Sequence, residues 1–169
     1  MKVLARLATA IYAGLLFVSC NSGKSQERDA GMISTSLSIS SYATAREHAT
    51  ASKDGTYFFP VLEIYNGSGA LIYRGHESAE NTRTLKEFPG SIQNLRPQEQ
   101  ASHLLKFLEE FPVFKERERG IQAKKWVIIS TGLDGCEGCA VQEHTLREEK
   151  QRLLLQQSVS ILEIHVTPP

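Results

Sequence analysis

The stretch of sequence that decides the fold runs Trp126-Val-Ile-Ile-Ser-Thr-Gly-Leu-Asp-Gly-Cys136-Glu-Gly-Cys139. Residues 126–130 are apolar and are bounded by Lys125 and Gly132, which is typical of a buried strand. Glycines punctuate the loop that follows. Residues 140–157 place their apolar side chains broadly on one side, which predicts a helix. The two cysteines therefore lie between a strand and the start of a helix.

This position suits redox chemistry. Cys136 lies where unpaired helix N–H groups and the positive end of the helix dipole favour negative charge. Thiolate, the attacking species, is therefore favoured over thiol. Cys139 follows about one helical turn later, close enough to displace a mixed disulfide. Because so short a loop contributes little loop entropy, we interpret the pair as one kept for its chemistry.

The segment resembles the active site of the thioredoxin family, including the membrane-tethered thiol–disulfide oxidoreductases of the bacterial envelope. On that resemblance Cys136 is the nucleophile, Cys139 is the buried resolving thiol, and no organic cofactor is required. The family commonly has Trp immediately before the first cysteine, where this chain has Gly135. Asp134 and Glu137 are negative and oppose thiolate formation. We therefore expect a weaker oxidant than family members with a strongly activated nucleophile.

A second segment resembles the C-terminal half of thioredoxin. Residues 57–65 are aromatic and β-branched, Asn66-Gly67-Ser68-Gly69 predicts a turn, and residues 70–74 return as a strand, so we expect a β-hairpin. In the family a cis-proline opens such a hairpin, lies against the active-site sulfurs and holds substrate backbone. That residue would be Pro60. The alternative is a trans proline that merely opens a strand.

In thioredoxin the half that carries the CxxC pair precedes the half that carries the hairpin, and in this chain the order is reversed. A circular permutation accounts for this, with the elements ordered β-α-β-β-α and then β-CxxC-α-β. The predicted fold is therefore α/β, a thioredoxin-like three-layer arrangement over residues 32–169 in which helices flank a mixed sheet. The strands that begin at residues 126 and 159 are then parallel, and the hairpin is antiparallel. The alternative takes the hairpin as the lead-in of the tethered reductases, in which case the chain lacks the second half of the fold.

The rest of the domain has weaker local signals. Residues 32–40 alternate between apolar and polar side chains, which predicts a strand. We expect a short helix at 43–52, mostly loop at 77–95, and an amphipathic helix that begins at Pro97 and stops before Pro112. A final strand is predicted at 159–166.

Residues 1–19 have the form of a signal peptide. Lys2 and Arg6 precede an apolar stretch that is too short to span a bilayer of about 30 Å comfortably. The stretch ends at Cys20, which with the small residue before it resembles the bacterial lipobox. In lipoproteins that cysteine carries acyl chains such as palmitate and becomes the first residue of the mature protein. An ordinary cleaved leader is the alternative.

Residues 20–31 are rich in small polar residues and predict a flexible tether. On the lipobox resemblance the protein is anchored in the bacterial cell envelope and faces the periplasm, and Asn21 in place of Asp favours the outer membrane. The expected partners are protein thiol or disulfide substrates, an envelope redox partner, and the membrane through the lipid anchor. The formal net charge is zero and there is no basic stripe, which argues against nucleic acid.

Two other functions remain open. A zinc or copper site would use Cys136, Cys139 and His144, a set similar to that of the copper chaperones of oxidase assembly, whose cysteines are usually separated by three residues. A four-ligand zinc site needs further ligands, and the sequence has no second cysteine pair. The simpler interpretation takes His144 as an exposed helix residue and His165 as a strand residue. The other function is a lipoprotein that uses the fold only to bind a partner.

Overall fold

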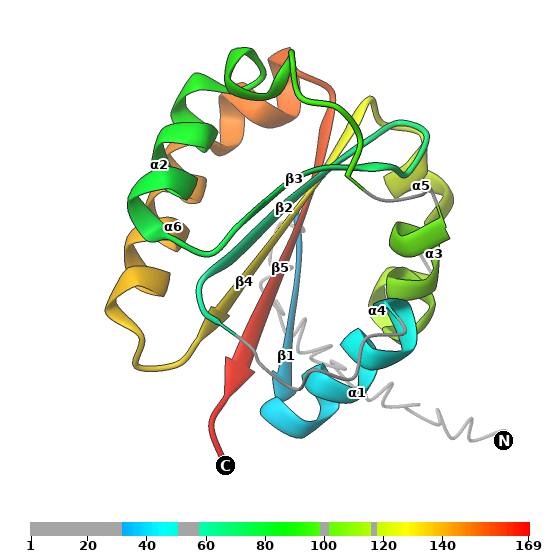
Figure 1. Ribbon diagram of the computed structural model, residues 1–169, viewed down its shortest axis with the longest axis vertical. Coiled ribbons are helices and arrows are strands. Elements are labelled where there is room, and N and C mark those ends of the chain that lie inside the picture. Colours follow the sequence, from blue (N-terminus) through cyan, green and yellow to red (C-terminus); the bar gives the residue numbers. More distant parts are fainter. Residues whose placement is uncertain (1–31, 51–57, 99–101, 116–117) are drawn as a thin grey trace, which may run out of the picture.

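The computed structural model describes residues 32–50, 58–98, 102–115 and 118–169. Within these ranges five strands form one mixed sheet in the order β1-β5-β4-β2-β3 (Figure 1). Strands β1, β5 and β4 are parallel, and β2 is antiparallel to both of its neighbours. The strands are β1 (Met32–Ser38), β2 (Val61–Asn66), β3 (Leu71–Gly75), β4 (Trp126–Leu133) and β5 (Val159–Thr167).

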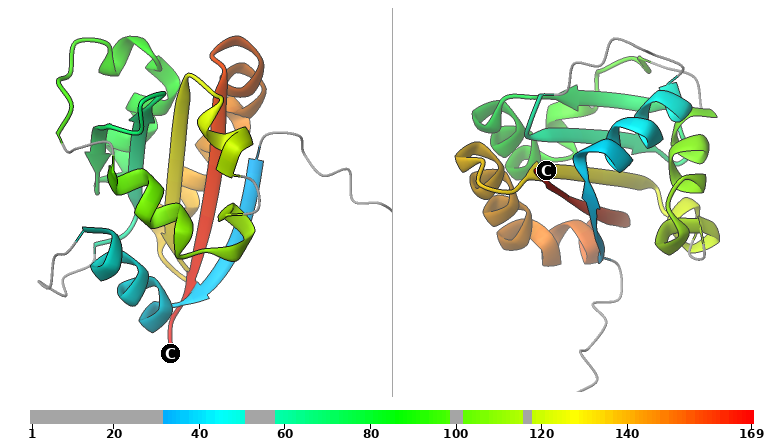
Figure 2. Two further views of the ribbon diagram at one scale, coloured as in Figure 1. Left: turned by 90° about the vertical axis from the view of Figure 1, so that its right-hand side faces the viewer. Right: turned by 90° about the horizontal axis from the view of Figure 1, so that it is seen from below.

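Helices cover both faces of the sheet (Figures 1 and 2). One face carries α2 (Ser78–Glu87) and α6 (Glu137–Gln151), with a 3₁₀ turn (Gly90–Ile92) after α2 and a π-helical turn (Arg152–Gln156) after α6. The opposite face carries α1 (Ile39–Thr50), α3 (Ser102–Glu109), α4 (Pro112–Lys115) and α5 (Glu118–Gln122). The predicted α/β class, with a mixed sheet and flanking helices, is confirmed.

Each face of the sheet has its own apolar cluster. Ile128 and Ile161 pack on the side of α2 and α6, whereas the next residues in each strand, Ile129 and Leu162, pack on the side of α1 and α3. Side chains alternate between the faces of a strand, so two consecutive apolar residues are both buried. This explains why β4 and β5 each contain consecutive apolar residues, 127–129 and 161–162, instead of a strict alternation.

Two of the predicted pairings are present. Strands β4 and β5 are parallel, with Trp126 opposite Val159, and β2 and β3 form the antiparallel hairpin. The turn is held by the side chain of Asn66, whose Oδ1 accepts hydrogen bonds from the backbone N–H groups of Ser68 at 3.1 Å and Ala70 at 2.9 Å. Residue 57 of the strand predicted at 57–65 lies outside the described residues, residues 58–60 are not part of a strand, and β2 begins at residue 61.

Other boundaries differ from the prediction. Residues 77–95, expected to be mostly loop, contain α2, which buries Asn81, Thr84 and Leu85. Two of these three residues are polar, so the helical spacing is invisible in the apolar pattern. Residues 97 and 98 of the helix expected from Pro97 are not helical, α3 is described from Ser102, and Pro112 opens the next short helix.

A buried charge cluster lies on the side of α1 and α3. Glu63 in β2 is fully buried; its Oε2 lies 2.7 Å from Nη2 of Arg46, and its Oε1 accepts a hydrogen bond from Nε of Arg74 at 2.8 Å. The Arg46 guanidinium also lies over the ring of Phe107, 4.8 Å from the centroid. Burial opposes ionisation of Glu63, but the two arginines outweigh it and lower the pKa of Glu63.

Candidate functional site

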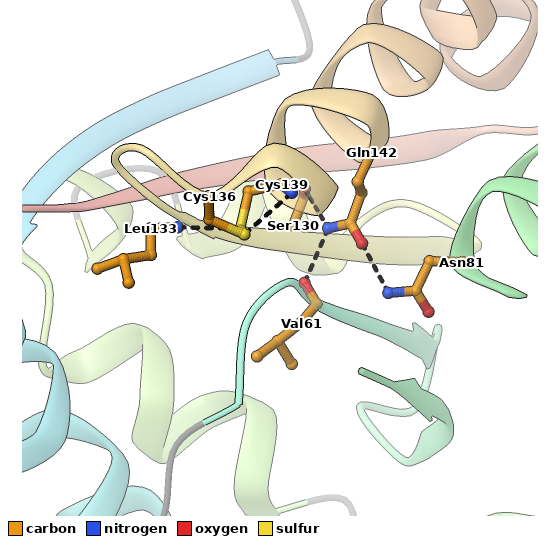
Figure 3. The surroundings of a disulfide bond; sticks show 7 residues. All are labelled: Val61, Asn81, Ser130, Leu133, Cys136, Cys139 and Gln142. Carbon is orange, nitrogen blue, oxygen red and sulfur yellow. Dashed lines mark hydrogen bonds between the residues drawn. A yellow bond between two sulfur atoms is a disulfide. The ribbon is translucent and has the colours of Figure 1, made fainter. Parts of the chain in front are cut away.

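The centre of the candidate site is a disulfide between Cys136 and Cys139, whose Cα atoms are 5.2 Å apart (Figure 3). Cys136 has extended backbone and caps the N-terminus of α6; its Sγ accepts a hydrogen bond from the backbone N–H of Cys139 at 3.1 Å. Helix α6 begins at Glu137 rather than at the predicted Ala140. Both sulfurs therefore lie at the helix start, where the unpaired N–H groups and the dipole favour a thiolate.

The two sulfurs differ in exposure. Cys139 is only 6% exposed, whereas Cys136 is half-buried. The Sγ of Cys139 also accepts a hydrogen bond from the backbone N–H of Leu133 at 3.3 Å. An incoming reagent can thus reach Cys136 more readily than Cys139, which is the asymmetry that a nucleophile and a resolving thiol require.

Two glycines shape the loop before the disulfide. Gly135 has a φ of +81°, a left-handed conformation that favours glycine. Gly132 in β4 lies under the second cysteine, since a Cβ atom at this position would be 3.2 Å from the Cβ of Cys139. The missing side chain at Gly132 leaves the space that Cys139 occupies.

Pro60 lies beside the disulfide loop. The Phe59–Pro60 peptide bond is cis, which confirms that expectation. The prediction placed Pro60 against Cys136, whereas the neighbour that the structure defines is Gly138. A Cβ atom added to Gly138 would lie 3.5 Å from Cδ of Pro60 and 3.3 Å from Cβ of Ser78. Glycine between the two cysteines therefore permits the close approach of both segments.

A network of neutral side chains joins this proline segment to α6. Gln142 is 1% exposed, and its Nε2 donates to the carbonyl oxygen of Val61 at 3.0 Å and to Oγ of Ser130 at 2.9 Å (Figure 3). Its Oε1 accepts from Nδ2 of Asn81 at 2.6 Å. Val61 directly follows the proline, so Gln142 connects the CxxC helix to the start of β2.

The network extends across the neighbouring hairpin. The Tyr73 hydroxyl donates to Oδ1 of Asn81 at 2.8 Å, and burial raises the pKa of Tyr73, so this hydroxyl keeps its proton. Neither Asn81 nor Gln142 was predicted from the sequence as part of the site. The available signal was the spacing of Cys139, Gln142 and Leu146, which puts a polar residue in the buried stripe of α6.

The surface around the disulfide is apolar and acidic. Phe58 is 62% exposed, its ring centroid lies 6.1 Å from that of His76, and Val141 on α6 is also exposed. Asp134 and Glu137 are exposed beside the cysteines.

The histidine of the alternative metal set is not assembled with the cysteines. The His144 side chain is 75% exposed, and its Nε2 lies 3.2 Å from Oε1 of Glu148 on the outer surface of α6. Across the described ranges, no group of three or more His, Cys, Asp or Glu residues is placed to hold a metal ion. The structure thus brings together Cys136, Cys139 and Pro60, but not His144.

The predicted signal peptide, Cys20 and the tether all lie outside the described residues. In the described part of the chain, no helix has both the length and the apolar character needed to cross a membrane. Comparison of the chain with protein-family models, with curated proteins and with solved structures gave no match.

Proposed function

We propose that this protein carries out thiol–disulfide exchange. The observation that carries the proposal is the Cys136–Cys139 disulfide at the N-terminus of α6, with one accessible sulfur and one buried sulfur. This arrangement supports a redox role because the helix start stabilises a thiolate at the accessible position, and the buried sulfur is already within bonding distance of it.

The exchange proceeds in two displacements. In the reduced protein the Cys136 thiolate attacks a substrate disulfide, forms a mixed disulfide and releases the first substrate sulfur as a thiolate. Cys139 then loses its proton and attacks Cys136, which restores the internal disulfide and releases the second substrate sulfur. The protein dithiol is oxidised by two electrons and the substrate disulfide is reduced. The reverse sequence oxidises a substrate dithiol.

We further propose a thioredoxin-like fold in permuted order. Three arrangements support it: the β4–CxxC–α6–β5 unit, the antiparallel β2–β3 hairpin followed by α2, and the approach of Pro60 to Gly138. The hairpin unit precedes the CxxC unit along this chain, which is the reverse of their order in thioredoxin, but β2 and β4 of the two units are neighbours in the sheet. In this proposal Pro60 and the adjoining backbone hold the substrate polypeptide.

The proposed location is the bacterial cell envelope, with Cys20 lipidated, residues 20–31 as a tether and the domain facing the periplasm. This proposal rests on the positively charged start of the chain, the short apolar stretch after it and the small residue before Cys20. Replacement of Cys20 by Ala should leave the leader unprocessed or release the protein from the membrane fraction. Unchanged fractionation would contradict the lipid anchor.

The decisive experiment for exchange compares two single variants. Cys139→Ser should accumulate mixed disulfides with substrate proteins, because nothing displaces the substrate from Cys136. Cys136→Ser is the matched control and should accumulate none. The reduction potential of the wild-type couple, measured beside zinc and copper(I) titrations of the reduced protein, completes the test. Tight stoichiometric metal binding without exchange would favour the metal site, and absence of both would favour a binding lipoprotein.

A further inference from the structure

A second buried carboxylate lies on the side of the sheet that carries α6. Glu163 in β5 is 4% exposed, and its Oε2 accepts a hydrogen bond from Oγ of Ser34 at 3.0 Å and lies 3.3 Å from Nε2 of His165. Its other oxygen, Oε1, is buried and has no hydrogen-bond partner in the described part of the chain. A buried carboxylate oxygen without a protein partner costs free energy.

The pair of Glu163 and His165 lies on the face of the sheet that carries the buried sulfur. Alternate residues of β5 share a face, and Ile161 packs in the same cluster as Leu146 of α6, so Glu163 and His165 also face α6. In the register of β4 and β5, His165 is opposite Gly132, the residue whose missing side chain makes room for Cys139. Adjacent strands are about 4.8 Å apart, so His165 is the neighbour on β5 of the glycine that Cys139 covers.

The two groups also differ in their access to water. Cys139 is 6% exposed and cannot exchange its proton freely with solvent. The His165 side chain is 29% exposed. His165 can therefore transfer a proton between the buried sulfur and bulk water.

We propose that His165, oriented by Glu163, is the base that takes the proton from Cys139 in the second displacement; this rests on the proposed function. Pairing of Nε2–H with the carboxylate leaves Nδ1 as the basic nitrogen. The S–H bond of Cys139 breaks and its proton passes to Nδ1, directly or through one water. The sulfur electron pair forms the bond to Cys136, and the bond from Cys136 to the substrate sulfur breaks. In the reverse reaction His165 returns the proton. Glu163 is a positioning residue.

The elements packed next to β5 carry other polar and charged groups. Ser36 of β1 is opposite His165 and does not titrate. Asp134 follows β4 and donates its backbone N–H to the carbonyl oxygen of Val166 at 2.9 Å. On α6, Glu143 follows Cys139 by one turn and is paired with Arg147. Any pH dependence must therefore be separated from that of Asp134 and Glu143 by substitution.

The test follows both displacements in one reaction. Reduced protein is mixed with a dithiobis-nitrobenzoate disulfide, whose coloured thiolate leaves once when Cys136 attacks and once more when Cys139 displaces it. His165→Gln should slow the second release about 100-fold and leave the first within about twofold. Its second-phase rate should keep rising with pH where the wild-type rate has levelled off. Glu163→Gln should slow the same phase less. His144→Gln, on the exposed side of α6, is the matched control and should change neither phase.

Three results would overturn the proposal. The second phase of His165→Gln could match the wild type, both phases could slow equally, or the pH profile could keep its wild-type shape. If His165→Gln does not fold, Glu163→Gln and the wild-type pH profile decide the question by the same criteria. Failure of the proposed function is distinct, because the wild type would then not exchange with protein disulfides and Cys139→Ser would accumulate no mixed disulfides with substrate proteins.

Discussion

Two buried glutamates on opposite faces of one sheet have different surroundings. Glu63 faces α1 and α3, and both of its oxygens are paired with arginines, Arg46 and Arg74. Glu163 faces α6, and only its Oε2 has neighbours, Ser34 and His165. Each carboxylate lies in a central position of its strand and is almost completely buried. Burial alone therefore does not determine what a carboxylate does in this fold.

The difference lies in how completely each charge is compensated. Removal of one member of a buried, fully paired ion cluster leaves the remaining charges without compensation, so Glu63 contributes to folding. Glu163 has one buried oxygen without a hydrogen-bond partner in the described part of the chain, and its other oxygen lies beside the titratable His165. In our proposal this is the setting of a group that orients a base. The same side chain supports stability on one face and is placed for chemistry on the other.

The largest effect is expected for Glu63→Gln. Arg46 would keep its charge in a buried position without the carboxylate, and the free energy of unfolding should fall by about 3–5 kcal/mol. Denaturant unfolding of variant and wild type measures this loss. The exchange rate per folded molecule should remain at the wild-type value, since Glu63 faces away from the disulfide. A loss below about 1 kcal/mol would show that, of the two buried glutamates, Glu63 is not the one that stabilises the fold.

The acid stability of the protein should depend on the same residue. The two arginines hold the folded-state pKa of Glu63 below its usual value of 4.5, although burial opposes them. Its contribution is therefore complete above the unfolded-state pKa and is lost as the pH falls through the folded-state pKa. The stability difference between wild type and Glu63→Gln should be greatest near neutrality and should shrink in acid. A difference that stays constant with pH would assign the acid sensitivity to another carboxyl group.

A smaller effect is expected for Gln142→Ala on the α6 face. The change leaves the carbonyl of Val61 without its amide donor and removes a partner of Asn81, which should cost about 1–3 kcal/mol of unfolding free energy. Exchange should also slow, because the segment after Pro60 is no longer tied to α6. Glu143→Ala, the adjacent substitution on the same helix, is the control and should change stability by less than about 0.5 kcal/mol. If the exchange rate of Gln142→Ala equals that of the wild type, the hydrogen-bond network around Gln142 has only a structural role.

The smallest change in stability is expected for Glu163→Gln. The amide retains an oxygen that can accept from Ser34, and no arginine is left uncompensated, so unfolding free energy should change by less than about 1 kcal/mol. The same unfolding experiment compares it directly with Glu63→Gln. Equal losses in the two variants would remove the contrast between the glutamates.

Much of the fold follows from local signals. The turn at Asn66 and the apolar run from Trp126 predicted a turn and a strand at the correct place, because strand period and turn chemistry act over a few residues. The alternating pattern at 32–40 also predicted a strand, but β1 ends at Ser38, and α1 begins at Ile39 rather than at the expected residue 43. The position of Cys136 at a helix start was readable for the same reason. Helix α2 was not, since Asn81 and Thr84 occupy its buried stripe.

The sequence by itself determined the existence of the strands, the hairpin, the CxxC pair at a helix start and a proline near the start of the hairpin. Only the tertiary structure decided which polar residues meet in the interior. Asn81 and Gln142 are 61 positions apart, Ser34 and Glu163 are 129 apart, and neither pair has a periodic signature. A buried polar side chain departs from the apolar pattern, and its partner is known only when the strand order and register are known. The register of β4 and β5, which puts His165 opposite Gly132, is a property of the assembled sheet.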